Sequence, residues 1–143
     1  MATVERSSVI KAPVDTVFAY LDDPLHLPEI WPSLIEIRDV KDLAQGGHEF
    51  HWTYKMAGVR LEGDTTTVEF EPKKHVVTKS TGEIPSTFEW TFAAENGSTR
   101  FTLKVDYEMP DSLVGKVTEP FVRKLNEHEA DAFVANLKDR IEA

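Results

Sequence analysis

The sequence has no cysteine, and this absence excludes disulfide bonds and thiol catalysis. Basic residues are also scarce, because 16 Lys and Arg stand against 25 Asp and Glu and leave a net charge of −9. No run of Lys or Arg forms a stripe that would neutralise phosphates, so we expect no nucleic-acid partner. No segment approaches the roughly 18 consecutive apolar residues of a membrane span, so we expect no integral membrane association.

The first residues also lack the apolar core of a signal peptide, because Glu5 and Arg6 stand in its place. This feature and the missing cysteines favour a cytoplasmic protein. The 143 residues suit one domain, and no linker-like stretch divides them. We therefore expect residues 1–143 to form a single domain, present as a monomer or a weak homodimer, whose acidity serves solubility.

The common chemical motifs are missing as well. His48 and His51 are three residues apart in a predicted strand, so they point to opposite faces and cannot share a metal ion. The pair Gly46-Gly47 has neither a P-loop nor a dinucleotide-binding pattern around it. The pair Ser7-Ser8 lacks the context of a nucleophile elbow. The sequence thus predicts no metal and no cofactor.

Residues 9–32 lead from a strand into two short helical segments that are bounded by prolines. Pro13 fits the first turn of a helix, where its missing N–H has no partner to lose. The apolar residues that follow at helical spacing are Val14, Val17, Phe18 and Leu21. Pro24 ends this helix, and a second short helical turn is predicted over residues 25–30, bounded by Pro28 and Pro32.

From residue 34 the apolar residues alternate with polar ones, which is the period of a strand. Strands are predicted over residues 34–40, 49–56, 61–71, 75–80, 88–92 and 101–107. Turns are predicted at Gly46-Gly47, Ala57-Gly58 and Asn96-Gly97, of which Asn-Gly is the strongest hairpin signal. Because the connections are short, neighbouring strands are expected to be antiparallel.

After Pro110 the period returns to that of a helix, which runs to about Ile141. Asp111 or Ser112 can cap it, and Pro120 either kinks it or marks the start of the main helix. One apolar arc contains Leu113, Val114, Val117, Phe121, Leu125, His128 and Ala132. A second arc contains Ala130, Phe133, Val134, Leu137 and Ile141. We expect the first arc to face a space inside the fold and the second to pack on the sheet, and the reverse assignment stays open.

The element order predicts an α+β fold in which a curved, seven-stranded antiparallel sheet wraps around the long C-terminal helix. The motifs V-I-K-A-P-V-D-T-V-F-A-Y-L-D-D-P, P-E-I-W-P, V-E-F-E-P and N-L-K-D-R-I-E follow one another in that order. In this arrangement the whole chain resembles the START/Bet v 1-like (SRPBCC) superfamily, and within it the polyketide cyclase/dehydrase-type proteins. The resemblance implies a helix-grip fold with a cavity for lipids, polyketides, hormones or other apolar molecules. It implies no fixed catalytic set, since members include cyclases, transport proteins and sensing proteins.

Many large side chains point to the inner face of the predicted sheet, more than one helix needs for cover. The candidate cavity residues are Phe50, Trp52, Tyr54, Met56, Phe88, Trp90, Phe92, Phe101, Leu103 and Tyr107 from the strands, with Val117, Phe121, Leu125 and His128 from the helix. They form either a solid core or a pocket. A dry pocket of ~300 Å³ would cost roughly 7 kcal/mol at ~24 cal/mol per Å³. We therefore expect any pocket to be hydrated, occupied or partly collapsed, with polar lining from Tyr54, Tyr107 and His128.

These residues are compatible with three functions. The leading hypothesis is a protein that binds a small hydrophobic or amphipathic molecule between the sheet and the C-terminal helix. The second is a cyclase- or dehydratase-like enzyme that uses Tyr54, Tyr107 or His128 for proton transfer. The third is a module that binds a protein partner through the exposed sheet face.

The orientation of three charged residues is also open. Arg6 either points inward, towards a carboxylate or a ligand oxygen, or lies at the surface. Glu62 and Asp64 are separated from Phe70 by even numbers of residues, so in a regular strand all three face the same side. Both acids then lie in the cavity, unless a bulge at Gly63 reverses the side to which they point.

Overall fold

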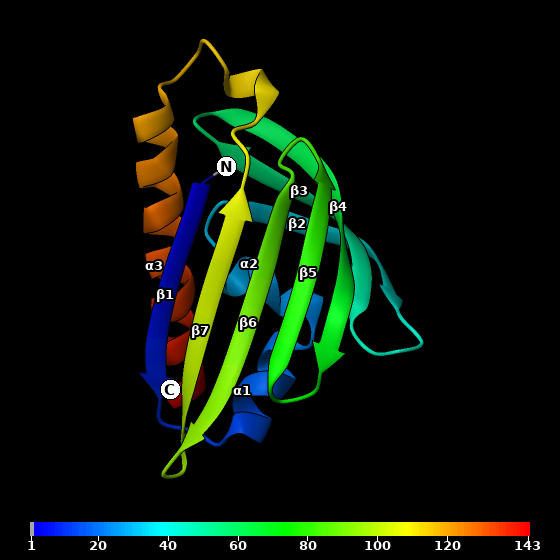
Figure 1. The fold of residues 1–143 in the computed structure, drawn as a ribbon, viewed down its shortest axis with the longest axis vertical. Helices are drawn as coiled ribbons and strands as arrows, with labels where there is room; N and C mark the ends of the chain where they lie inside the picture. Colours follow the sequence, from blue (N-terminus) through cyan, green and yellow to red (C-terminus); the bar gives the residue numbers. More distant parts are fainter. Residues whose placement is uncertain (1) are drawn as a thin grey trace.

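The computed structural model describes residues 2–143, except the side chain of Ser112. Its seven strands form one antiparallel sheet in the order β1-β7-β6-β5-β4-β3-β2. The strands are β1 (Ala2–Ile10), β2 (Leu34–Asp42), β3 (His48–Met56), β4 (Val59–Glu71), β5 (His75–Gly82), β6 (Ser86–Glu95) and β7 (Ser98–Tyr107). The sheet curves around the long helix α3 (Glu119–Glu142), which confirms the predicted helix-grip-like architecture (Figure 1).

Tight turns make β2 to β7 neighbours in space in the order of the sequence. At the β6–β7 turn, Asn96 and Gly97 have φ values of 50° and 83°. At the β3–β4 turn, Ala57 and Gly58 have φ values of 51° and 79°. Positive φ at both central residues is the conformation whose twist matches that of the flanking strands, and it explains the Asn-Gly preference. Both predicted hairpin turns are therefore confirmed.

The connection from β1 to β2 is different, because it leaves the sheet through three short helical pieces. These are α1 (Val14–Leu21), the 3₁₀ turn η1 (Pro24–His26) and α2 (Leu27–Ile30). The chain enters α1 directly after Pro13, and the Asp23 carboxylate accepts a hydrogen bond of 3.0 Å from the Leu25 N–H to start η1. The two predicted short helices between the first and second strands are thus present.

Strand β1 closes the sheet against β7 and lies along α3. Its pairing with β7 runs from Ala2 opposite Tyr107 to Ile10 opposite Thr99. Arg6 Nε donates to Asp131 Oδ1 of α3 at 2.6 Å. Arg6 thus has a carboxylate partner, but the side chains of Arg6 and Asp131 are 32% and 60% exposed, so the pair lies at the surface and not in the cavity.

Helix α3 begins at Glu119, after a separate 3₁₀ turn η2 (Asp111–Leu113). The Thr118 hydroxyl accepts a hydrogen bond from the Phe121 N–H at 3.3 Å, and Pro120 sits in the first turn, where it costs no helical hydrogen bond. The open alternative in which the main helix starts near Pro120 is therefore correct. Asp111 does not cap this helix, and the side chain of Ser112 lies outside the described part of the chain.

Strand β4 contains a bulge that reverses its faces. Leu61, Gly63, Thr65 and Thr67 are buried on the inner face, whereas Glu62 and Asp64 are exposed. The register with β5 shifts between Thr67 and Glu69, which leaves Val68 46% exposed and packs Phe70 against the core. The expectation that Glu62 and Asp64 face the cavity is therefore wrong, because the bulge lies at Val68 and breaks the parity with Phe70.

The two acids instead lie on the outer face with His51. Its Nε2 lies 3.0 Å from Glu62 Oε1, and its Nδ1 lies 3.1 Å from Asp64 Oδ1. The hydrogen bond with Glu62, ahead of that with Asp64, raises the pKa of His51 above its ordinary value.

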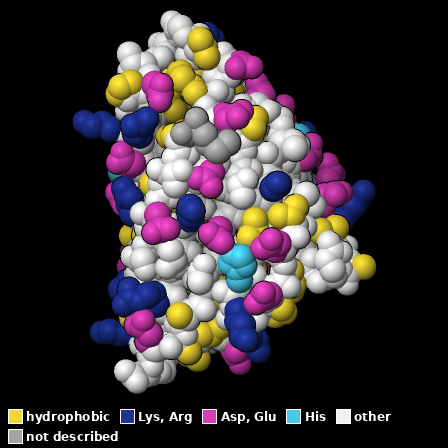
Figure 2. Space-filling view, in the orientation of Figure 1, with side chains coloured by type: hydrophobic (Ala, Val, Ile, Leu, Met, Phe, Trp, Pro, Cys, Tyr) yellow, Lys and Arg dark blue, Asp and Glu magenta, His cyan; other side chains and the backbone are white. Residues whose placement is uncertain are grey.

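Acidic and basic side chains are interspersed over the face of the molecule seen in Figure 2. That face therefore carries no continuous field of one sign.

Candidate ligand cavity

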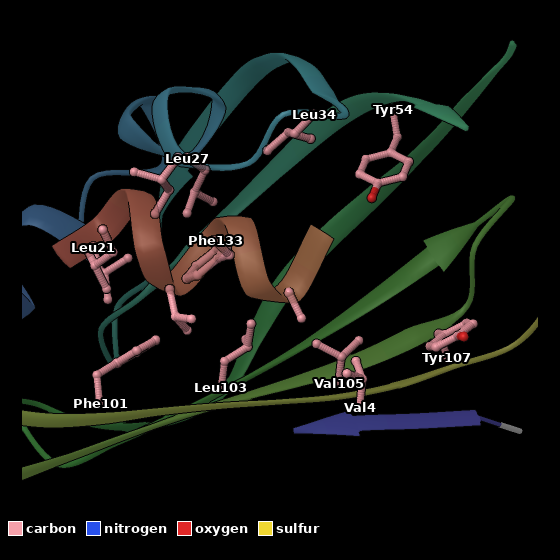
Figure 3. Close-up of a cluster of buried hydrophobic side chains, with 14 of the residues drawn as sticks. Val4, Leu21, Leu27, Leu34, Tyr54, Phe101, Leu103, Val105, Tyr107 and Phe133 are labelled. Carbon is pink, nitrogen blue, oxygen red and sulfur yellow. The ribbon is translucent and has the colours of Figure 1, made fainter. Parts of the chain in front are cut away.

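A cavity of about 110 Å³ lies between the concave face of the sheet and α3. Seven of the candidate residues line it: Phe50, Trp52, Tyr54, Phe88, Trp90, Leu103 and Tyr107. Figure 3 shows the Tyr54 hydroxyl pointing from β3 into the space between the layers, with Val105 and Tyr107 on the opposite wall. The period-2 alternation of the strands is what brings these side chains to one face.

Three other candidate strand residues are buried beside the cavity without lining it. Met56 is 4% exposed, Phe92 5% and Phe101 0%. Phe101 stacks on Phe133 of α3 with ring centroids 6.1 Å apart, and Phe92 packs between Phe101 and Phe18 of α1. The end of the inner face that contains Phe92 and Phe101 is therefore a solid core, as the alternative interpretation of the aromatic residues expected.

The helical arc that was expected to face the interior points away from it. His128 is exposed, Phe121 is 47% exposed, and Val117 and Leu125 are half-buried, so none of these four lines the cavity. Helix α3 contributes Asn126, Glu129, Ala130 and Phe133 instead. The expectation for the first arc is therefore wrong. The second arc packs on the sheet as expected, because Phe133 contacts Phe101 and the ring of Trp31, whose centroid is 5.6 Å away, and this arc also faces the cavity.

One hydrogen-bonded group ties three elements together at the cavity. Trp31 Nε1 donates to the Tyr54 hydroxyl at 3.2 Å, and that hydroxyl donates to Glu129 Oε1 at 3.4 Å. The same carboxylate oxygen accepts a bond of 2.8 Å from the Ser33 N–H. Burial, together with the negative charge of Glu129, raises the pKa of Tyr54 far above its ordinary value. The phenol is therefore held as a neutral hydrogen-bonding group.

The central strands contribute small hydroxyl side chains to the floor of the cavity. This hydroxyl floor consists of Thr65 and Thr67 on β4, Thr78 and Ser80 on β5, and Ser86 on β6. Thr65 and Ser80 face each other across the β4–β5 pair and hydrogen-bond to each other. Their small volume leaves open the space that larger side chains would fill. None of these five residues was among the candidates predicted from the sequence, although the strand parity of Leu61 predicts an inward orientation for both threonines of β4.

Three buried side-chain polar atoms within residues 2–143 have no hydrogen-bond partner, and all three belong to residues that line the cavity. They are Trp52 Nε1, Trp90 Nε1 and His48 Nε2. An unpaired buried donor costs about 1–3 kcal/mol, so such atoms are rare in folded proteins. Their concentration here indicates a place for water or a ligand.

His48 lies at the end of the cavity that is formed by α1 and the β2–β3 hairpin. Its Nδ1 is 2.9 Å from Asp42 Oδ1, whereas its Nε2 is 3.5 Å from Asp22 Oδ1 and forms no hydrogen bond. Burial raises the pKa of Asp22, and the nearby His48 opposes this rise. His48 and His51 point to opposite faces of β3, as their spacing predicts.

The described residues contain no group of three or more His, Asp or Glu side chains arranged to hold a metal ion. Within the same part of the chain, no helix has both the length and the apolar character needed to cross a membrane.

A curved sheet that grips one long helix around an apolar cavity defines a helix-grip protein. The profile of the "Polyketide cyclase / dehydrase and lipid transport" family matches residues 1–142. The chain therefore belongs to this family, and a START superfamily protein is among its structural neighbours.

Solved structures from other organisms share the fold. A START superfamily protein of Mycobacterium smegmatis has a TM-score of 0.81 at 15% identity, with 98% of this chain and 97% of that chain covered. The ZhuI aromatase/cyclase of a Streptomyces species has a TM-score of 0.79 at 18% identity, with 99% and 93% covered. The Thermus thermophilus protein TTHA0849 has a TM-score of 0.75 at 21% identity, with 98% and 97% covered. No protein with a curated description matches the chain in sequence. At these identities the similarities define the fold alone.

Proposed function

We propose that the protein binds a small hydrophobic or amphipathic molecule in the cavity between the sheet and α3. The observation that carries this proposal is an apolar interior space lined by three residues that each carry an unpaired buried polar atom. The family description, which names lipid transport, supports the same class of ligand.

The size of the cavity limits what fits without movement. An empty cavity of about 110 Å³ costs about 3 kcal/mol at ~24 cal/mol per Å³. A domain with ~5–15 kcal/mol of total stability can carry this cost, and an occupant offsets it. An engineered cavity of ~150 Å³ accommodates benzene, so a single ring or a short chain suits the space here. A larger ligand requires α3 and the sheet to separate.

The enzymatic alternative has less support from the arrangement of its proposed proton-transfer groups. His128 is exposed on the outer side of α3, away from the cavity. Tyr54 has a raised pKa, which moves it further from the near-neutral value that suits acid–base catalysis. Binding without chemistry is therefore the function we propose.

A substitution that fills the cavity tests this proposal. Ala130 is buried on the cavity side of α3, and Ala135 is exposed on the same helix. The neutral fluorescent probe N-phenyl-1-naphthylamine is larger than a single ring, so its binding requires α3 and the sheet to separate. We expect Ala130→Leu to weaken binding of this probe at least tenfold, and the control Ala135→Leu to leave it unchanged. Thermal unfolding of both variants verifies that they are folded, because overpacking alone costs about 1–3 kcal/mol.

Native mass spectrometry of the protein purified from a lipid-rich lysate provides an independent measurement. A bound molecule retained by the wild type and lost from Ala130→Leu supports the proposal. Failure to bind the probe, together with no retained molecule, overturns it. Equal probe binding by the wild type and Ala130→Leu overturns the location in the cavity.

A further inference from the structure

We propose that the cavity selects uncharged molecules with an oxygen acceptor, such as a ketone, ester or ether, and that this oxygen accepts a hydrogen bond from the indole N–H group of Trp52 or of Trp90. This inference rests on the proposed binding function and adds the chemical class of the ligand.

The two indoles define the acceptor. Trp52 is 6% exposed on β3, and Trp90 lies on β6 with its ring centroid 6.4 Å from that of Phe133. Each Nε1–H is buried and unpaired, and an indole nitrogen can only donate. A hydrocarbon or an ammonium group would leave both donors unpaired, whereas a carbonyl or ether oxygen accepts a hydrogen bond from either one.

A third indole in the same cavity shows that unpaired donors are not a general feature of its tryptophans. Trp31 lines the cavity too, but its Nε1 donates to the Tyr54 hydroxyl at 3.2 Å. The protein supplies an acceptor for this indole and none for Trp52 or Trp90. The missing acceptors are therefore specific to the two indoles that flank the hydroxyl floor.

The charges around the cavity exclude anions. Its lining, among the residues that the structure describes, includes the carboxylates of Asp22 and Glu129 and no Lys or Arg. Arg6 is engaged outside the lining, with Asp131 and Glu127 of α3. The one basic side chain of this lining within residues 2–143, His48, already lies between the carboxylates of Asp22 and Asp42. A buried carboxylate or phosphate of a ligand would therefore find no Lys or Arg in that lining and would lie near like charges, which is strongly unfavourable.

The two sides of the cavity also orient the ligand. The sheet register sets Trp52 opposite Gly63 on β4 and Trp90 opposite Val76 on β5, and the hydroxyl floor lies between these positions. The opposite wall, formed by α3 and α2, contributes the apolar side chains of Ala130, Phe133 and Leu27. The ligand is therefore placed with its oxygen towards the sheet and its hydrocarbon face towards the helices.

Three single-ring compounds of similar size separate these features. Acetophenone carries a carbonyl, isopropylbenzene replaces the oxygen by a methyl group, and benzoate carries a charge. We expect acetophenone to bind about tenfold more tightly than isopropylbenzene, which corresponds to one buried hydrogen bond, and benzoate to bind most weakly at neutral pH. Binding is measured by NMR on ¹⁵N-labelled protein, in which the indole N–H signals of Trp52 and Trp90 are expected to shift with acetophenone.

Phenylalanine substitutions test the indoles themselves. Trp52→Phe and Trp90→Phe each remove a free donor, and the ratio of acetophenone to isopropylbenzene affinity is expected to fall towards one in the variant that removes the donor of the bound oxygen. Trp31→Phe is the matched control, because it removes an indole whose donor is already paired. It is expected to change both affinities by the same factor and to keep the ratio.

The outcomes separate this inference from the function on which it rests. A ratio near one in the wild type, a preference for benzoate, or an unchanged ratio in both Trp52→Phe and Trp90→Phe overturns the ligand class and leaves the binding function in place. Absence of binding by all three compounds also overturns this inference, while the naphthylamine probe and mass spectrometry decide the binding function separately.

Discussion

The indole ring of Trp52 lies directly against the backbone of Gly63 on the neighbouring strand. The two residues are paired in the β3–β4 register, and a Cβ atom at position 63 would overlap the six-membered ring of Trp52 and the carbonyl oxygen of Thr81. Glycine at this position therefore gives the indole its place at the cavity wall.

Gly63→Ala is expected to lower the free energy of unfolding by about 1–3 kcal/mol, because the added methyl group overpacks the site. The displaced indole should also change the intrinsic tryptophan fluorescence and weaken probe binding. The control is Gly97→Ala in the open β6–β7 turn, where no atom lies within 4 Å of the added Cβ and only the positive φ opposes the change. Gly97→Ala should leave fluorescence and probe binding unchanged, and equal probe affinity in both variants would contradict the role of Gly63.

The hydrogen bond between Trp31 and Tyr54 is expected to couple α2 to β3. Tyr54→Phe leaves the Trp31 N–H without its acceptor, so the free energy of unfolding should fall by about 1–2 kcal/mol. A double-mutant cycle with Trp31→Phe, measured by urea unfolding, should give a coupling of about 0.5–1.5 kcal/mol. Strictly additive effects would show that the bond contributes nothing to stability.

Ionisation of Tyr20 should make the protein less stable in alkaline solution. Burial, then the hydrogen bond of 2.7 Å and the charge of Glu29, raise the pKa of Tyr20 to about 12. Because the unfolded tyrosine ionises near pH ~10, the contribution of Tyr20 is complete below that pH and is lost as the pH rises towards its folded pKa. Chemical unfolding of Tyr20→Phe between these pH values should show a shallower loss of stability than the wild type. An unchanged slope would contradict the assignment.

The His51 group on the outer face should titrate above the ordinary range of histidine. Its stabilising contribution is complete below pH ~6.5 and is lost as the pH rises through the raised pKa of the folded state. Glu62→Gln should lower the pKa of His51, as measured by NMR titration of the imidazole. Glu69→Gln, which changes a carboxylate beside His75, is the control and should leave the His51 titration curve in place.

The strand pattern predicted most of the sheet because each strand has two distinct faces. In β3 the large residues Phe50, Trp52 and Tyr54 alternate with polar ones, and burial on the inner face follows directly from this period. The bulge at Val68 could not be predicted in the same way. A valine suits either face of a strand, so only the pairing with β5 reveals that the register shifts beside it.

The helix side of the cavity was harder to predict for a related reason. Both arcs of α3 contain large apolar residues, so periodicity alone cannot decide whether Phe121 or Phe133 faces inward. The decision depends on packing, because Phe133 meets Phe101 and Trp31. The hydroxyl floor could not be predicted from hydrophobicity, because its residues are small and polar whereas a hydrophobic pocket is expected to be lined by large apolar side chains.

The pairing of β1 with β7 has a consequence for the order in which the molecule assembles. Residue 2 pairs with residue 107, so β1 has no partner until β7, the last strand of the sheet, has been synthesised. Such distant pairing slows folding, since a long loop must close before any contact rewards it. Helix α3, which covers the cavity, follows later still. The binding space therefore exists only after α3 has been synthesised, and a ligand must enter a completed fold.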